Sequence, residues 1–220
     1  MCHIEFPDLL AGLKARHSVR AYLAEPLSAE LLKSVMEGAV CAPSAKNVQP
    51  WEAYVVSGDA MTRMRQALDR AFTAGERVPL GVEGEAKIYN ARSHELFREM
   101  APYIEKTGWD MHASVRNSIR MFEAPTAVFL CMDKNAAPGH LLDLGIFVEN
   151  LCLSALAHGL GSCIIGYVRM VEPAVREFLK LSEDQRFLLA VALGYPDAAS
   201  PMNQFHSSRV SMEESVHFLS

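Results

Sequence analysis

The chain has 220 residues, half of them apolar and 21% charged, with a formal charge of −5 at pH 7. This length and composition are typical of a globular protein that buries a sizeable core. The mildly acidic balance argues against a nucleic-acid-binding protein, which needs a strongly basic face.

Cysteine and histidine usage excludes several kinds of site. The five cysteines form no C-x-x-C pair and the eight histidines form no H-x-x-x-H pattern, so we expect neither a disulfide framework nor a metal site. Reduced thiols and an N-terminus without a basic and apolar leader favour a cytoplasmic location. The most apolar stretch, residues 141–161, contains Asp143 and Glu149, so it predicts a buried helix rather than a membrane span.

The first informative segment is Arg16-His17-Ser18-Val19-Arg20, which follows a short helix predicted from about residue 6 to residue 13. Two guanidinium groups with a hydroxyl and a ring N–H suit a phosphate or another oxyanion. The alternative is a basic helix end in water, where the helix dipole favours cations without any ligand. Taken alone, the segment leaves both interpretations open.

The second informative segment is a loop bracketed by two prolines. A helix capped by Ser28 is predicted to end before Pro43, and a strand is predicted at residues 52–56, after the loop. The loop carries Ser44 and Asn47 as aimed polar groups that can contact a ligand. Alternatively, these side chains satisfy only the local backbone.

The two segments together resemble the nitroreductase family of FMN-dependent oxidoreductases. The start of that family usually reads Arg-Arg/His-Ser-x-Arg/Lys, followed by Pro-Ser-x-x-Asn-x-Gln-Pro-Trp, and both patterns are intact here. The resemblance implies an α+β fold, a three-layer α/β/α sandwich with a central, mostly antiparallel sheet, in an intertwined homodimer. It covers residues 1–220 as a single FMN-binding domain, most weakly in a variable, lid-like region at about 73–114. No G-x-G-x-x-G motif opens a βαβ unit, so a Rossmann domain is not expected.

Periodicity and capping signals predict the remaining elements. Further helices are expected at residues 58–72, 88–104, 111–121, 141–158 and 171–179, strands at 126–131, 162–166 and 185–193, a loop at 73–84, and a short helix after residue 210. In the family, the region near residues 89–112 would shape substrate access. Tyr103, Trp109 and His112 are suited to stacking on a planar ligand, with ordinary helix packing as the alternative.

The resemblance also implies a flavin site assembled from distant parts of the chain. Arg16 and Arg209 would hold the FMN phosphate, and Arg20 would lie near the flavin pyrimidine, where a cation stabilises the reduced form. Ser44 and Asn47 would reach FMN from the partner subunit. The full expected cofactor-binding set is Arg16, His17, Ser18, Arg20, Pro43, Ser44, Ala45, Asn47, Asn117, Arg120, Ile164, Ile165, Gly166 and Arg209.

The remaining members of this set come from the second half of the chain. Asn117 and Arg120 would touch the ring edge and the ribityl-phosphate chain, although Arg120 could pair with Glu123 instead. Gly166, next to two isoleucines, would let the backbone approach the flavin without a Cβ in the way. Ser207 stands where many relatives carry a second lysine, so the phosphate site has one cation fewer.

The implied activity is transfer of hydride from NADH or NADPH through flavin N5 to an electron-poor acceptor, such as a nitroaromatic or a quinone, with ping-pong kinetics. No side chain is assigned as an acid or base. The expected partners are a second copy of the chain, with the FMN sites at the subunit interface, and a small-molecule acceptor, without nucleic acid or membrane. Two alternatives stay open: a dehalogenating or flavin-fragmenting enzyme of the same fold, and a protein that stores FMN or senses redox state.

Overall fold

A computed structural model describes residues 7–80 and 86–219 of the chain. The helices are α1 (Pro7–Ala15), α2 (Ala29–Val40), α3 (Gly58–Thr73), α4 (Lys87–Thr107), α5 (Met111–Ile119), α6 (His140–Ala157) and α7 (Glu172–Leu179). The strands are β1 (Glu52–Ser57), β2 (Thr126–Asp133), β3 (Gly161–Ile165) and β4 (Gln185–Gly194). Most predicted elements are present within a few residues of their expected bounds. Residues 81–84 of the predicted loop lie outside the described residues.

The four strands form one sheet in the order β1-β2-β4-β3, and every neighbouring pair is antiparallel. Val128 in β2 pairs with Val55 on one side and with Val191 on the other, and Ile164 of β3 pairs with Val191. The expected antiparallel sheet is therefore confirmed. Its β3 edge carries the Ile164–Ile165 pair that the family resemblance assigned to the flavin.

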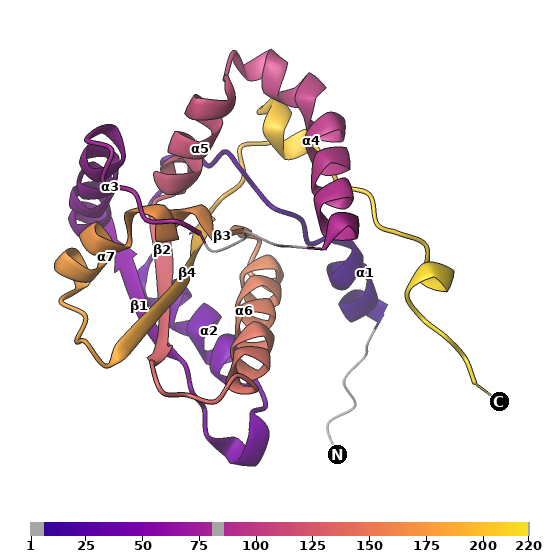
Figure 1. Cartoon of the computed structure of the whole chain (residues 1–220), viewed down its shortest axis with the longest axis horizontal. Coiled ribbons are helices and arrows are strands. Elements are labelled where there is room, and N and C mark those ends of the chain that lie inside the picture. The colour runs from indigo at the N-terminus through magenta and orange to yellow at the C-terminus, as the bar shows by residue number, and fades with distance from the viewer. Residues whose placement is uncertain (1–6, 81–85, 220) are drawn as a thin grey trace.

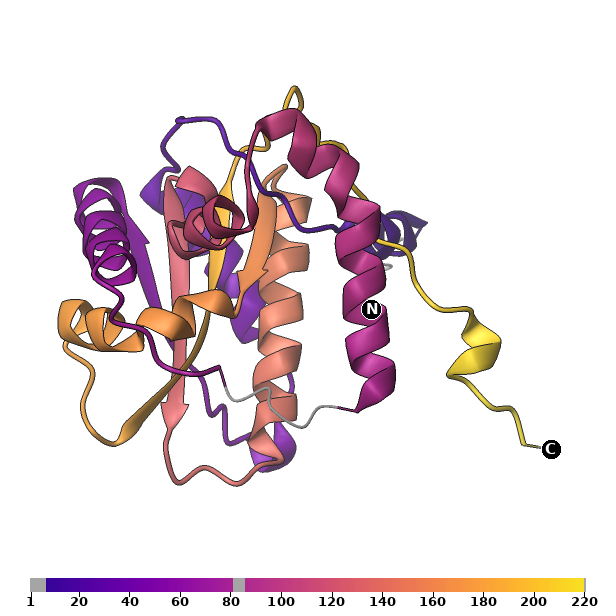
Figure 2. The ribbon, with the colours of Figure 1, turned by 45° about the horizontal axis from the view of Figure 1, so that its top comes forward.

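Helices cover both faces of the sheet, which makes the predicted three-layer sandwich. Helices α3 and α7 lie on one face, and α2 and α6 lie on the other (Figures 1 and 2). Strand β2 is buried on both sides because its side chains alternate: Phe129 belongs to the α3 side of the core and Val128 to the α6 side. Helix α6 is long and apolar enough to cross a membrane by length and composition alone. Here it packs against α2 and the sheet, as a core helix does.

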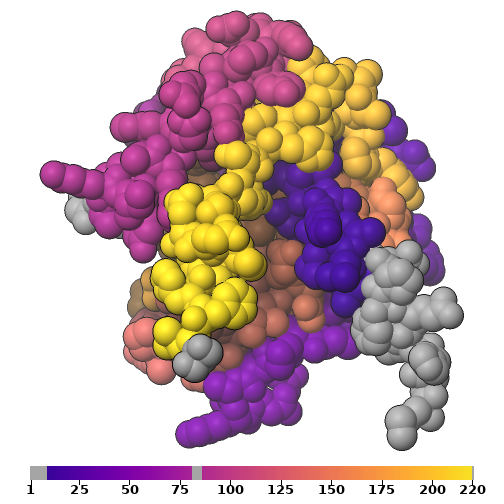
Figure 3. Space-filling model, turned by 90° about the vertical axis from the view of Figure 1, so that its right-hand side faces the viewer, coloured from indigo at the N-terminus to yellow at the C-terminus, as the bar shows by residue number. Residues whose placement is uncertain are grey.

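Helix α4 forms an outer wall beside the sandwich. Its buried Met100 packs with Met202 and Phe205 from the segment after β4. Figure 3 shows that the C-terminal segment, in yellow, then runs between α4, in magenta, and α1, in indigo. The lid-like region therefore contains a packed helix, and the aromatic and sulfur-containing side chains of the chain's last fifth hold it in place.

Two predicted helices differ from the structure, and the first difference has a clear physical cause. The helix expected to reach residue 121 ends at Ile119, because Met121, Phe122 and Glu123 adopt positive φ values of 57°, 51° and 60°. Such left-handed conformations stop an α-helix, and no glycine announces them in the sequence. The short helix expected after residue 210 is only a three-residue 3₁₀ turn, Met212–Glu214.

Candidate active site

The backbone of the basic segment, residues 16–20, is fixed to the β3 edge of the sheet. Val19 N donates to Ser162 O at 2.9 Å, the Tyr22 hydroxyl donates to Val19 O at 2.9 Å, and Val19 is buried. A Cβ at Gly161 would lie 2.6 Å from Val19 Cγ2, so glycine is needed for this close approach. The segment therefore presents its charged side chains from a rigid backbone.

The two guanidiniums of this segment are only lightly engaged by the protein. Arg16 Nε lies 3.5 Å from Glu149 Oε1 of α6, too long for a strong charge-assisted hydrogen bond. Arg20 Nη1 donates to Ser18 O at 3.2 Å, and its backbone N–H donates to Asn203 Oδ1 at 2.7 Å. Both cations thus keep most of their donors available for an anion.

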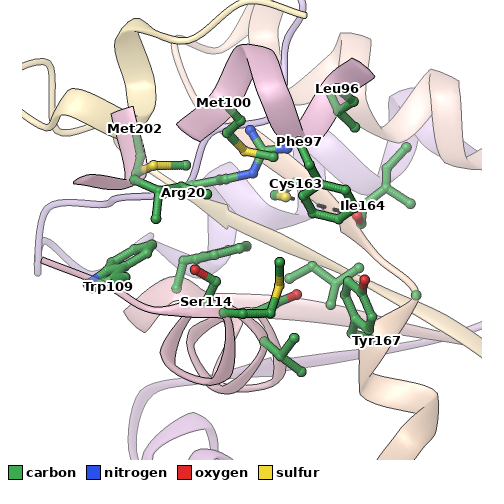
Figure 4. A pocket seen from close by; sticks show the side chains of 17 residues that line it. Arg20, Leu96, Phe97, Met100, Trp109, Ser114, Cys163, Ile164, Tyr167 and Met202 are labelled. Carbon is green, nitrogen blue, oxygen red and sulfur yellow. Dashed lines mark hydrogen bonds between the residues drawn. The ribbon is translucent and has the colours of Figure 1, made fainter. Parts of the chain in front are cut away.

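A pocket opens between β3 and the α4–α5 wall, with about 790 Å³ of empty space that is partly open to solvent. Figure 4 shows Arg20 reaching into it near Cys163 and Met100, with Ser114 and Tyr167 on the lower side of the view. Among the described residues, Arg20 is the only charged one that lines the pocket. The lining consists of Arg20, Leu96, Phe97, Met100, Ile104, Trp109, Met111, Ser114, Val115, Ser118, Phe122, Cys163, Ile164, Ile165, Gly166, Tyr167 and Met202.

The β3 side of the pocket offers backbone rather than reactive side chains. A Cβ at Gly166 would meet no heavy atom within 4 Å, so its backbone is open to the pocket, and Ile164 is 41% exposed. Burial raises the pKa of the Cys163 thiol above its ordinary value, so the neutral form dominates and the thiol is a poor nucleophile. This wall suits a flat, largely apolar ring whose edge meets the Arg20 cation.

The proline-bracketed loop is held in place by α6. Ala45 N donates to Asp143 Oδ1 at 3.1 Å, and the His140 Nδ1 atom lies 2.8 Å from Asp143 Oδ2. These two hydrogen bonds, first that of His140 and then that of Ala45, lower the pKa of the buried Asp143 carboxyl. Asn47 has a positive φ of 59° and is exposed at the surface. Pro43 precedes it in the same exposed loop. The Ser44 hydroxyl accepts from the backbone N–H of Gln49, as expected if the loop side chains satisfy the local backbone.

The two motif segments lie at opposite ends of α6. The loop is bonded to Asp143 in the first turn, whereas Val19 is bonded to Ser162, after the last turn. An 18-residue α-helix is about 27 Å long. Although the Arg16 side chain reaches Glu149 in the middle of α6, no hydrogen bond or pocket among the described residues joins Ser44 or Asn47 to the arginines of residues 16–20.

Arg209 and His17 illustrate how the C-terminal tail meets this region. The His17 ring lies 4.3 Å from that of His206 in the tail. Arg209 follows in a different groove, beside Arg92 of α4, and its Nη1 donates to backbone and hydroxyl oxygens of Ser207 and to Ser208 O. The structure places Arg209 outside the Arg20 pocket, so its assignment to the phosphate stays a prediction.

Arg120 and Asn117 also lie outside the pocket lining. Arg120 pairs with Glu123 at 2.6 Å and with Asp69 at 3.2 Å, which is the pairing that the sequence left open as an alternative. Asn117 is partly buried on α5, but the same helix turns Ser114 and Ser118 toward the pocket. Flavin contacts by Asn117 and Arg120 stay predictions.

The resemblance expected the region near residues 89–112 to shape substrate access, but no α4 residue that lines the pocket was assigned to the site from the sequence. Met100 and Ile104, with Leu96, repeat at helical spacing, and that pattern does not distinguish a pocket wall from a core face. Of the three aromatic candidates, only Trp109 lines the pocket. The Tyr103 ring packs 5.4 Å from that of Phe205, and the His112 ring packs 5.1 Å from that of Phe72.

Comparisons with known proteins agree with this geometry. The model of the "Nitroreductase family" matches residues 13–195. A nitrobenzene nitroreductase from Ectopseudomonas oleovorans is 28% identical over 94% of this chain and 95% of its own length, and a 4-nitrobenzoate reductase from Pseudomonas putida is 28% identical over 96% of each. The crystal structure of the FMN-dependent nitroreductase NfnB from Mycobacterium smegmatis, in complex with NADPH, superposes with a TM-score of 0.89 at 25% identity, covering 96% of this chain and 98% of that one. The chain belongs to the nitroreductase family.

Proposed function

We propose that this family member, an FMN-dependent NAD(P)H oxidoreductase, reduces nitroaromatics or quinones in the pocket between β3 and the α4–α5 wall. One observation carries the proposal: a single guanidinium, Arg20, enters an apolar pocket beside backbone at Gly166 that no side chain covers. The relatives named for nitrobenzene and 4-nitrobenzoate reduction support this class of acceptor. Cytoplasmic residence, favoured by the reduced cysteines, is part of the proposal.

The pocket walls fit the ring of a flavin. Ile164 and Ile165 would border the ring with the backbone at Gly166, and Arg20 would stabilise the negative charge that reduction places on the pyrimidine edge. Bound FMN would supply the redox chemistry, so that NAD(P)H and one proton together deliver two electrons and two protons to the acceptor. With FMN and an acceptor bound, the apolar lining would leave little room for water, which would strengthen the charge interaction at Arg20.

The other cation of the basic segment suits the flavin phosphate. Arg16 would donate to it together with the Ser18 hydroxyl and the His17 ring, and the 3.5 Å separation from Glu149 leaves its donors free to turn. Arg209 would join them from the tail, because His206, three residues earlier, already contacts the His17 ring.

A second copy of the chain would complete the site. Because the loop and the basic segment lie at opposite ends of α6, antiparallel packing of α6 from two chains would bring the loop of one to the basic segment of the other. The outer face of α6 suits this packing, since Leu142 is 74% exposed and Ile146 is 40% exposed. We therefore propose a homodimer in which Ser44 and Asn47 reach the flavin bound by the partner.

Anaerobic reduction tests the proposed activity. FMN-loaded protein mixed with NADPH or NADH should lose its flavin absorbance at about 450 nm rapidly, and a quinone or a nitroarene should restore it. A flavin that binds but stays oxidised would favour storage or sensing. Protein that takes up no FMN would refute the proposal.

Light scattering and FMN titration test the proposed dimer together. Leu142→Asp should give a monomer that loses FMN affinity, because each site would lack the partner's loop. Val55→Asp is the matched control. Val55 lies on β1, the edge strand furthest from β3, so this variant should remain dimeric and retain FMN. A wild-type monomer with full FMN occupancy would contradict the shared site.

A further inference from the structure

The candidate acceptor pocket has one charged lining residue, and we propose that it selects uncharged nitroarenes over nitroarenes that carry a carboxylate. The inference rests on the proposed function, because it concerns the acceptor of the same pocket. The relatives do not decide between these classes, since the nitrobenzene and 4-nitrobenzoate reductases are both 28% identical to this chain.

In the proposed function, the single cation of the pocket is engaged by the flavin. Arg20 reaches into the pocket near Cys163, where the proposal places the flavin ring edge, and its guanidinium otherwise donates to the neutral carbonyl of Ser18. A substrate carboxylate drawn to Arg20 would compete with the negative charge of the reduced ring. Two anions sharing one guanidinium in a pocket of low dielectric repel each other strongly.

Among the described residues, the opposite wall holds no cation that could pair with a carboxylate. Phe97, Met100 and Met111 present apolar surface, and the polar groups on this side are neutral: the hydroxyls of Ser114 and Ser118 and the indole N–H of Trp109. A buried carboxylate without a cationic partner is costly, whereas a nitro group is neutral overall and needs only modest donors. The wall therefore favours acceptors whose only strongly polar group is the one to be reduced.

The charges in the groove beside α4 do not change this balance. This groove shares Leu96 with the pocket and is lined by Arg92 and Arg209 and also by Glu95 and Glu99, so two cations face two anions. The groove therefore gives no net attraction for an anionic substrate.

Direct binding and turnover on FMN-loaded protein test the preference. Dissociation constants for nitrobenzene and 4-nitrobenzoate, measured by titration without nicotinamide, should favour nitrobenzene by about tenfold or more, and kcat/KM with NADPH should follow. Equal or tighter binding of 4-nitrobenzoate would overturn the proposal, because some cation would then be pairing with the carboxylate.

A positive charge introduced into the pocket lining should weaken the preference for nitrobenzene over 4-nitrobenzoate. Met111 is 60% exposed, so Met111→Arg should fold normally. The variant should lower the ratio of kcat/KM for nitrobenzene to kcat/KM for 4-nitrobenzoate at least about fivefold, mainly through a lower KM for 4-nitrobenzoate. Leu96→Arg is a second variant on the α4 side. Val55→Arg adds the same charge on β1, at the far edge of the sheet, and should leave the ratio unchanged. If neither pocket variant changes the ratio, the proposal is wrong.

Menadione reduction separates this inference from the proposed function. Protein that holds FMN and oxidises NADPH with menadione, yet treats the two nitroarenes alike, would refute only the acceptor preference. Protein that holds no FMN, or leaves NADPH unoxidised with every acceptor, would refute both.

Discussion

The two motif segments, one at each end of α6, are held in place by different means. The basic segment is fixed through its backbone, by Ser162 and Asn203, and its guanidiniums are left largely unpaired. The loop is fixed through the buried carboxylate of Asp143, which accepts a hydrogen bond from the Ala45 N–H. The loop side chains of Ser44 and Asn47 are polar but uncharged. The difference fits the proposed division of work. One segment would supply ligand charge from a rigid backbone, and the other would supply neutral hydrogen-bonding groups from a loop that another helix positions.

The largest effect is expected at the basic segment. Arg20→Ala and Arg16→Ala should each weaken FMN binding by roughly 10- to 100-fold, since each removes a charge-assisted hydrogen bond. Arg20→Ala should also lower the flavin reduction potential, whereas Arg16→Ala should leave it nearly unchanged. FMN titration and spectroelectrochemistry measure both, with Arg92→Ala as the charge-matched control. Full occupancy and unchanged potentials in both variants would refute these roles.

The backbone of the same segment should be sensitive to a single methyl group. Gly161→Ala would place a Cβ 2.6 Å from Val19 Cγ2, and such overpacking costs about 1–3 kcal/mol of unfolding free energy. Gly12→Ala in α1 is the control, because its Cβ would meet Leu156 at an ordinary 3.8 Å. Urea unfolding measures the difference. Equal stability of the two variants would show that the segment is not rigidly seated on β3.

The sequence alone predicted most of the fold because its helices and strands have strong periodicity and cap signals. Ser28 caps α2 as expected, with its Oγ accepting from Leu31 N at 3.1 Å. The turn at Met121 was missed because non-glycine residues there adopt left-handed backbone that no residue type signals. Tertiary packing, which periodicity does not encode, decides these cases.

The site was predicted less completely than the fold. The motif identified the basic segment and the loop but could not show that they flank a helix about 27 Å long. The resemblance pointed to the region of α4, but its lining residues were not identified because Met100 and its apolar neighbours have the same spacing on a core face and on a pocket face. Arg120 matched the family pattern by position, yet its side chain pairs with acidic neighbours from α3 and the following turn.

A smaller effect is expected at the other end of α6. Asp143→Ala would remove the acceptor of the Ala45 N–H, loosen the loop and weaken FMN binding about several-fold. Asp143→Asn keeps an acceptor oxygen for that N–H and should restore most of the affinity, which a general packing role for the side chain would not predict. The flavin potential should stay constant in both variants, in contrast to Arg20→Ala. A potential that falls in Asp143→Ala would mean that the loop tunes the ring as well.

The smallest effect is expected away from α6, in the ion-pair network that joins α3 to α5. The hydrogen bond from Arg116 lowers the pKa of the Asp69 carboxyl, with smaller contributions from the charges of Arg120 and Arg116. A carboxyl whose pKa is lower in the folded state stabilises the fold above its unfolded pKa of about 3.9, and that contribution is lost as the pH falls through the folded value. Because Arg116 is 45% exposed, solvent screening keeps the contribution to about 1 kcal/mol or less.

Asp69→Asn should therefore lower the free energy of unfolding at pH 6 and differ less from wild type at about pH 3, where the wild-type carboxyl is becoming protonated. Urea unfolding at the two pH values measures this change, and Asp59→Asn on the same helix is the control. FMN affinity should not respond, because Asp69 does not line the pocket proposed for the flavin. A loss of FMN affinity in Asp69→Asn would instead connect Arg120 to the flavin, as its sequence position first suggested, and would make α5 a third source of ligand charge beside the basic segment.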